Sequence, residues 1–113
     1  MTITGVTIRL RVDDLQEAVD FYEQLTGQTA NRFAFGGAEL AASGPFLLFA
    51  APDHVAERLS RVAATISVDD FVVQGRALTQ LGAEIVAPAS VTPNGHRLVA
   101  RHPDGSVFEY VGP

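Results

Sequence analysis

A single carboxylate, Glu109, interrupts an apolar run near the end of the chain and is the first residue that could carry chemistry. The stretch His102–Val111 reads HPDGSVFEYV, a Pro-Asp-Gly turn followed by β-branched and aromatic residues. A carboxylate on such a strand can act as a general base, contact a ligand or pair with an arginine, and it is costly without a partner. A general base needs a raised pKa and a substrate proton within reach, so the sequence favours an ion pair or a ligand contact.

Two arginine residues near the start of the chain offer the complementary charge. Arg9 and Arg11 alternate with Ile8 and Leu10, and this period of two is typical of a strand with one polar and one apolar face. Three roles are open for the two arginine residues: contact with a ligand, an ion pair with Glu109, and solvent exposure beside surface acids.

The composition excludes several other kinds of chemistry. There is no cysteine, and therefore no disulfide, thiolate catalysis or cysteine-bound metal. The net charge is -5 and the eight basic residues are scattered, which disfavours a nucleic-acid partner. No apolar run approaches the roughly 18 residues of a membrane span, and no leader pattern is present. No serine triad, phosphate loop or dinucleotide fingerprint can be assembled. We expect a cytoplasmic protein without a membrane or nucleic-acid partner.

A repeat at half the chain length organises the sequence. Arg11-Val-Asp-Asp-Leu15 returns 56 residues later as Ser67-Val-Asp-Asp-Phe71. A chain of 113 residues is long enough for one compact domain and too short for two ordinary ones. We therefore predict one domain, residues 1–113, made of two modules at about 1–51 and 61–113, with a linker at 52–60 that contains a short helical turn.

Each module is predicted to contain one strand, one helix and three further strands. Asp14 can cap a helix whose apolar residues recur at helical spacing, and Gly27 is placed to end it in a left-handed conformation. The second module repeats this pattern with a weaker helix, because Gly75 lies in its interior. Turn signals then separate three short extended segments in each half. The predicted fold class is α+β, with two tandem βαβββ modules.

This combination of motifs resembles a known family. The segment RVDDLQEAVDFYEQLTG after an alternating strand, the repeat and the closing HPDGSVFEYV are similar to the vicinal oxygen chelate superfamily, also called the glyoxalase, bleomycin-resistance and extradiol-dioxygenase group. The resemblance covers nearly the whole chain and implies two modules whose curved sheets form an open cup around a ligand site. It identifies the fold far more specifically than the function.

The resemblance also locates the positions at which metal-dependent members of the family bind their ion. These members place His, Gln or Glu at four equivalent positions, in the first and last strand of each module. The positions fall on Thr7, Leu48, Ala63 and Glu109. One residue of the family's type does not hold a divalent ion, which needs several converging ligands. We therefore expect no family-type metal site and no cofactor.

The same resemblance indicates which residues line the predicted cup. Thr7, Arg9 and Arg11 share one face of the first strand, and Glu109 lies on the last strand. Apolar lining is expected from Phe46 and Leu48 on the fourth strand and from Phe35, which precedes the Gly36-Gly37 turn at the rim of the pocket. Apolar walls with a few polar groups are typical of a small-molecule pocket.

These features predict metal-independent binding of a small aromatic or anionic molecule, similar to the antibiotic-binding members of the superfamily, by a homodimer. Two alternatives stay open. One is a glyoxalase-like lyase or isomerase, or a dioxygenase-type enzyme, with an atypical or absent metal site. The other is an interaction domain whose cup is filled by its own side chains.

Overall fold

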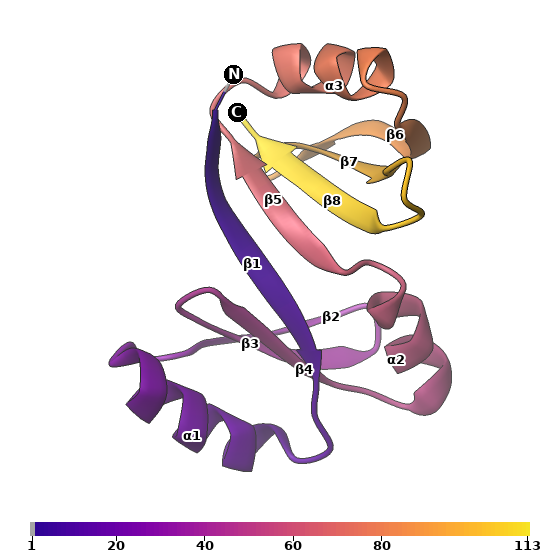
Figure 1. The fold of residues 1–113 in the computed structure, drawn as a ribbon. Helices are drawn as coiled ribbons and strands as arrows, with labels where there is room; N and C mark the ends of the chain where they lie inside the picture. Colours follow the sequence, from indigo (N-terminus) through magenta and orange to yellow (C-terminus); the bar gives the residue numbers. More distant parts are fainter. Residues whose placement is uncertain (1) are drawn as a thin grey trace. The chain divides into compact units, whose positions relative to one another are not determined.

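The computed structural model describes residues 2–113, which form eight strands and three helices (Figure 1). The elements are β1 (Ile3–Arg11), α1 (Leu15–Thr26), β2 (Asn31–Phe35), β3 (Ala38–Ser43), β4 (Phe46–Ala50), α2 (Asp53–Ser60), β5 (Ala64–Val68), α3 (Phe71–Gln80), β6 (Glu84–Thr92), β7 (Gly95–Arg101) and β8 (Val107–Gly112). The predicted α+β fold with two βαβββ modules is confirmed. The linker contains the predicted helical segment as α2. No helix within residues 2–113 is both long enough and apolar enough to cross a bilayer.

The chain forms two compact units. The first unit is Thr7–Arg61, and the second comprises the residues up to Val6 together with Val62–Pro113. In the second unit the start of the chain is held by a pair of hydrogen bonds: the Thr2 amide donates to Asp69 Oδ1 at 2.7 Å and the Asp69 amide donates to Thr2 O at 3.1 Å. The N–H donated by Thr2 lowers the pKa of the Asp69 carboxyl group.

The first unit contains a sheet with the strand order β2-β3-β4-β1. Strand β1 runs parallel to β4, and the other neighbours are antiparallel. Helix α1 packs on one face through Leu15 and Val19, which contact Ala41 and Leu48; this is the α1 face. Helix α2 packs on the other face against a separate apolar cluster that includes Leu40 and Phe49; this is the α2 face.

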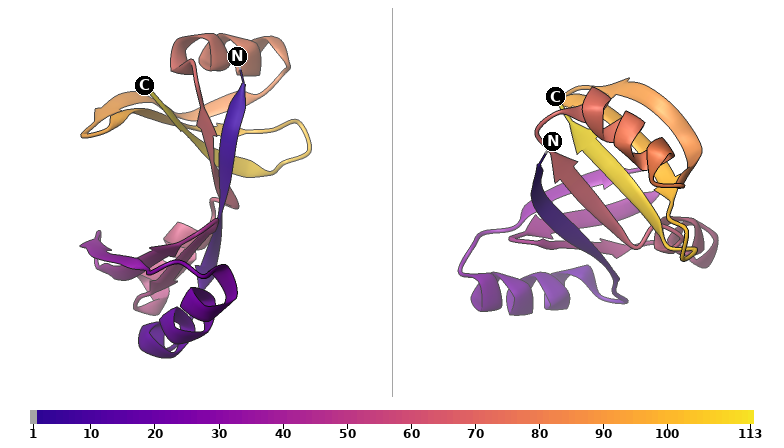
Figure 2. Two further views of the ribbon diagram at one scale, coloured as in Figure 1. Left: turned by 90° about the vertical axis from the view of Figure 1, so that its left-hand side faces the viewer. Right: turned by 45° about the horizontal axis from the view of Figure 1, so that its top comes forward.

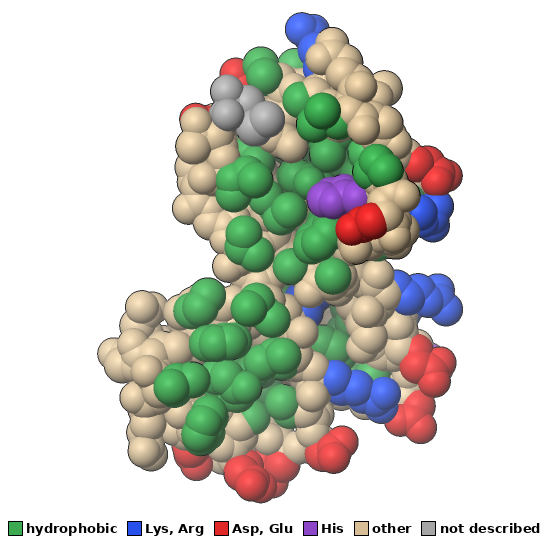
Figure 3. Space-filling model, in the orientation of Figure 1, with side chains coloured by type: hydrophobic (Ala, Val, Ile, Leu, Met, Phe, Trp, Pro, Cys, Tyr) green, Lys and Arg blue, Asp and Glu red, His purple; other side chains and the backbone are tan. Residues whose placement is uncertain are grey.

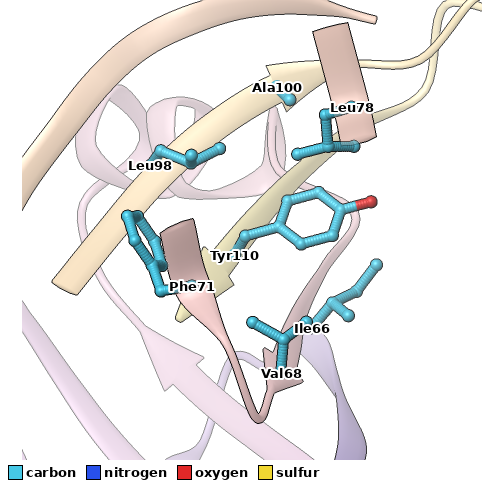
Figure 4. Packing of buried hydrophobic residues seen from close by; sticks show 7 residues of the cluster. All are labelled: Ile66, Val68, Phe71, Leu78, Leu98, Ala100 and Tyr110. Atoms are coloured by element: carbon cyan, nitrogen blue, oxygen red, sulfur yellow. The ribbon is translucent and has the colours of Figure 1, made fainter. Parts of the chain in front are cut away.

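The second unit contains a sheet with the strand order β5-β8-β7-β6. Helix α3 covers one face, as the two views of Figure 2 show. The core beneath it contains Ile66, Val68, Phe71, Leu78, Leu98, Ala100 and Tyr110, with the Tyr110 ring among them (Figure 4). The opposite face carries Glu109 and is here called the Glu109 face. Both units therefore bury apolar side chains between a helix and a sheet, which neither element could do alone.

The helix starts follow the predicted capping chemistry in both units. The Asp14 side chain accepts a hydrogen bond from the Glu17 amide at 3.0 Å, and Asp70 accepts one from the Val73 amide at 3.1 Å. Each aspartate satisfies an amide of the first turn that has no partner within the helix. Gly27 ends α1 with a φ of 70°, the left-handed conformation predicted for it.

Several of the apolar residues that recur at helical spacing in α1 and α3 are exposed. Phe21 and Leu25 of α1 are each 60% exposed, and Val72 of α3 is 59% exposed. Figure 3 shows hydrophobic side chains gathered on the surface of the first unit around α1. The helices here are single layers on small sheets, so a sheet can cover only the part of each apolar stripe that faces it.

Candidate functional site

Glu109 lies in β8 and has two partners in its own unit. Arg97 Nε donates to Glu109 Oε2 at 2.8 Å, and the Thr65 hydroxyl donates to Glu109 Oε1 at 3.0 Å. Strand register explains both contacts. Thr65 on β5 pairs directly with Glu109. On β7 the residue paired with Glu109 is Val99, and Arg97, two residues before it, lies on the same face of the sheet. A carboxylate in an apolar strand is thus satisfied on both oxygens, as the cost of burying it requires.

Arg97 occupies a row of residues that crosses the Glu109 face. Its neighbours in this row are Ser90 on β6 and Val111 on β8. Between Ala87 and Ser90 the register of β6 shifts by one residue, so the strand bulges beside Val99 and Arg97. Bulges commonly redirect side chains next to functional sites, and this one sets a hydroxyl beside a guanidinium group.

The two predicted arginine residues lie on the α2 face of the first unit. Arg11 Nη2 contacts Asp53 Oδ1 at 2.6 Å, at the start of α2, and Arg9 Nη1 donates to Leu59 O at 3.5 Å, near its end. Thr7 shares their face by the alternation of the strand and is half-buried. The prediction that these three residues share a face agrees with the register, and their contact with a ligand stays a prediction. The ion pair of Arg11 is with Asp53, and a pairing of Glu109 with Arg9 also stays a prediction.

The prediction that Phe46 and Leu48 lie on the same face as Arg9 and Arg11 is wrong. Parallel pairing aligns Phe46 with Ile8 and Leu48 with Leu10, on the α1 face. Leu48 is fully buried there, and Phe46 packs against Tyr22 with ring centroids 4.8 Å apart. The helix covers the side of the strand that the prediction assigned to the ligand.

Phe35 is the one predicted apolar residue that shares a face with the arginines. It pairs with Ala38, which packs against α2. The ring is 72% exposed, at the end of the edge strand β2. Its role as a ligand contact is not tested by this geometry and stays a prediction.

Strand pairing also corrects the internal alignment of the two modules. Thr65 pairs with Glu109 in the second unit, and the residue 56 positions before Thr65 is Arg9, which pairs with Leu47. The first-module equivalent of Glu109 is therefore Leu47 and not Leu48. Leu47 lies three residues after the turn glycine Gly44, whereas Glu109 lies four residues after Gly105, so counting from the turn glycines misplaced the register.

The other face of β8 carries a histidine and a tyrosine in contact. The turn at Pro103–Gly105 brings His102 Nε2 to 2.7 Å from the Tyr110 hydroxyl, and the His102 ring packs on Phe108. Burial raises the pKa of the Tyr110 phenol. In the same turn the Ser106 amide donates to Asp104 and lowers the pKa of its carboxyl group. These contacts fix the entry of the chain into β8, and hence the place of Glu109.

Comparison with known proteins identifies the family. Residues 5–110 match the model of the Glyoxalase/Bleomycin resistance protein/Dioxygenase superfamily. The chain belongs to this superfamily. No curated protein sequence matches the chain.

Solved structures of the superfamily fold resemble the chain over nearly its whole length. An uncharacterized protein from Methanosarcina mazei is 37% identical, with a TM-score of 0.89 over 99% of this chain and 94% of that chain. Methylmalonyl-CoA epimerase from Mycobacterium tuberculosis is 21% identical, with a TM-score of 0.71 over 98% of this chain and 89% of that chain. A Streptomyces coelicolor methylmalonyl-CoA epimerase variant in complex with 2-nitronate-propionyl-CoA is 16% identical, with a TM-score of 0.66 over 98% of each chain. The two epimerases share the fold with this chain.

The residues present do not fit the metal site that the superfamily implies. With the corrected alignment, the four positions are Thr7, Leu47, Ala63 and Glu109, and only Glu109 is of the type that those sites use. Within residues 2–113 no three His, Asp or Glu side chains gather into a group that could hold an ion. Glu109 instead accepts hydrogen bonds from a cationic and a hydroxyl side chain of its own unit.

Arg97 is the residue of this superfamily member that sequence reasoning missed. The signal was present, because the turn at Pro103–Gly105 joins two antiparallel strands and counting outward from it sets Val99 opposite Glu109. One alternation further along β7 places Arg97 on the same face. The sequence alone does not assign faces to the strands before that turn, and the first strand, with its clear alternation of polar and apolar residues, offers Arg9 and Arg11 as partners of Glu109 instead.

Proposed function

We propose that this superfamily member binds a small aromatic or anionic molecule without a family-type metal ion. The observation that carries this proposal is the polar network of Glu109, Arg97 and Thr65 on a sheet face that also carries the apolar side chains of Val99, Val107 and Val111. Apolar surface with a few fixed polar groups suits a small organic ligand. The description of the matched superfamily includes bleomycin resistance proteins, so a binding role is consistent with membership.

Thr7, Arg9, Arg11 and Phe35 are proposed as further ligand contacts on the α2 face of the first unit. Phe46 and Leu48 are withdrawn from the proposed site because α1 covers them. Arg9 and Arg11 contact the two ends of α2, and this fixes both side chains along one strand. Side chains that are held in place lose less conformational entropy when a ligand binds.

A thermal-shift screen with metal analysis tests this proposal. Protein purified without chelators is analysed for bound metal and then screened, with and without EDTA, against planar aromatic compounds and small oxo-acids. We expect no stoichiometric metal and at least one compound that raises Tm equally in both buffers. A ligand at 100 times its Kd stabilises a protein by about 2.7 kcal/mol, which such a screen detects. Stoichiometric metal, or stabilisation that EDTA abolishes, would contradict metal-independent binding.

A second candidate function is an enzyme of the lyase, isomerase or dioxygenase type. The observation that favours it is that a carboxylate, Glu109, occupies one family ligand position. Because two proteins of the same fold are methylmalonyl-CoA epimerases, the direct assay is exchange of the substrate α-proton of methylmalonyl-CoA in D2O, followed by NMR with and without added divalent ions. Exchange that is lost in Glu109→Gln would establish this function. An absence of exchange favours the binding protein.

The protein is also proposed to be a cytoplasmic homodimer. Strand β2 forms an edge of the first-unit sheet, and all five of its residues are exposed. An exposed edge strand leaves unpaired backbone groups that a second copy can satisfy, and twofold dimers are the commonest oligomers. Light scattering across a dilution series is expected to give twice the chain mass, and a monomer at all concentrations would contradict this proposal.

A further inference from the structure

The Arg97 guanidinium group has hydrogen-bonding capacity that the protein does not use. Its Nε is held by Glu109 at 2.8 Å, and neither Nη atom has a hydrogen-bond partner among residues 2–113. The side chain is 37% exposed, so ligand atoms can reach it. Guanidinium is planar and presents five N–H donors in a fixed fork geometry. Because Glu109 anchors Nε, the plane of the guanidinium group is fixed. The two Nη groups therefore present their N–H donors to a ligand in a defined orientation.

A comparison within β7 shows that this ion pair differs from an ordinary surface pair. Arg101 lies on the same face of the strand and contacts Glu84 at 2.6 Å, where the carboxylate side chain is 68% exposed. The carboxylate side chain of Glu109 is only 15% exposed. A pair removed from water to this extent gains little stability over apolar residues of similar size, because the desolvation cost offsets the attraction. Stability alone therefore does not account for Arg97 at this position.

The surroundings of Arg97 suit a ligand that carries both an oxyanion and an apolar part. Ser90 lies beside Arg97 on β6, next to the bulge, and its hydroxyl can donate a hydrogen bond to the same oxyanion. Val111 and Val99 lie on the same face and supply apolar contacts. The negative charge of Glu109 would repel a bound anion. The hydrogen bond that Thr65 donates to the other carboxylate oxygen of Glu109 reduces this repulsion.

From these contacts we infer that Arg97 binds the carboxylate or phosphate group of the ligand through its two Nη atoms, while Glu109 holds the guanidinium in place. This inference rests on the proposed small-molecule binding and names the ligand class for that site. Charge-assisted, paired hydrogen bonds of this kind are strong and geometrically specific. They also explain how an acidic protein with a net charge of -5 can select an anion at one place.

Titration with three simple probes tests the assignment. Benzoate and phenyl phosphate carry the oxyanion, and benzamide has the same ring without the charge. Binding is followed by two-dimensional NMR of backbone amides and arginine Nε–H groups, in wild type, Arg97→Gln and the matched control Arg101→Gln. We expect benzoate or phenyl phosphate to shift the Arg97 Nε–H resonance and the amides of β6 to β8. Arg97→Gln should weaken that binding by about tenfold or more, as the loss of one charge-assisted contact implies, and Arg101→Gln should leave it unchanged.

The outcomes separate this inference from the proposed function. Binding of either oxyanion that is equal in Arg97→Gln and wild type overturns the assignment, as does the absence of any oxyanion-dependent shift in wild type. In either case, stabilisation by uncharged aromatic compounds in the thermal-shift screen would leave metal-independent binding standing. Equal binding of benzamide and benzoate would likewise overturn the assignment alone. Retention of the native amide spectrum in Arg97→Gln excludes misfolding as the cause of lost binding.

Discussion

Arg97 Nε lies 2.8 Å from Glu109 Oε2, and the two residues come from neighbouring antiparallel strands, β7 and β8. The resemblance to the superfamily aligns Glu109 with a metal-ligand position of its metal-dependent members, and in this chain a guanidinium group of the same unit donates to it. An arginine is a permanent cation at any physiological pH. The pair therefore places a fixed positive charge next to that carboxylate without the need for an ion.

The first prediction concerns the cost of breaking this pair. Glu109→Leu removes the carboxylate that accepts hydrogen bonds from Arg97 Nε and from the Thr65 hydroxyl, and should lower the free energy of unfolding by about 1–3 kcal/mol, a range discounted because Arg97 is more than a third exposed. The double variant Arg97→Met, Glu109→Leu removes both charges and should recover most of the loss. Urea denaturation measures all three proteins. A double variant as unstable as Glu109→Leu would contradict this, because the loss would then not come from the uncompensated charge of Arg97.

The second prediction concerns stability at alkaline pH. Burial raises the pKa of Tyr110 in the folded state, so above about pH 10, where the phenol of the unfolded chain deprotonates, the folded state binds more protons than the unfolded state. The stabilisation is complete below the unfolded pKa and is lost as pH rises through the folded pKa. Tyr110→Phe should lack this loss, although at neutral pH it should be less stable by about 1 kcal/mol because the hydrogen bond to His102 is missing. Urea midpoints at neutral pH and above pH 10 measure both effects. If wild type and Tyr110→Phe lose the same stability between the two pH values, the alkaline loss does not come from Tyr110.

The local features of the fold were predictable because they depend on few neighbouring residues. Asp14 and Gly27 act at the ends of α1 as their chemistry requires, and the repeat of Arg11–Leu15 at Ser67–Phe71 reports two copies of one module. Register was less predictable. Leu47 and Leu48 are both apolar, and only the number of residues in the preceding turn decides which of them faces α2.

The site was predictable in part for the same reason. Glu109 is conspicuous because it interrupts an apolar run. Arg97 follows a polar turn, and only its position across the strands from Glu109 separates it from the other arginine residues. Assigning that position requires the pairing of β7 with β8, which is a tertiary property of the chain. The placement of Phe46 under α1 likewise depends on the parallel pairing of β4 with β1.

The third prediction uses the two helix caps as a matched pair. Asp14→Ala and Asp70→Ala each remove the acceptor of a first-turn amide, and each should cost about 1 kcal/mol of stability. The corresponding Asn variants keep an acceptor and should lose much less. Thermal unfolding of the four proteins checks this. Equal losses in the Ala and Asn variants would show that the negative charge at the helix start matters more than the hydrogen bond.

The fourth prediction is that one substitution in α3 stabilises the protein. Gly75 lies inside the helix, and a Cβ atom added there would meet only Leu98 Cδ2, at the ordinary contact distance of 3.7 Å. Gly75→Ala should raise the free energy of unfolding by about 1 kcal/mol, since alanine has the higher helix propensity. Urea denaturation measures the change, and a decrease would mean that the neighbouring strands cannot accept the added methyl group.

The last prediction contrasts two turn glycines that both have positive φ angles. Gly95 has a φ of 145°, and a Cβ atom there would lie 2.3 Å from the backbone oxygen of Gly112, so the β7–β8 pairing would have to shift. Gly105 has a φ of 92° and nothing within 4 Å of the added atom. Gly105→Ala should therefore cost only the conformational strain of about 1–2 kcal/mol, and Gly95→Ala should cost more, about 3 kcal/mol or above. Because the shift would move β7 relative to β8, the Arg97 Nε–H resonance should change in Gly95→Ala and stay in place in Gly105→Ala. If the two variants are equally stable and the Arg97 Nε–H resonance is unchanged in both, the end of β8 can move without cost. It would then not fix the register of the ion pair.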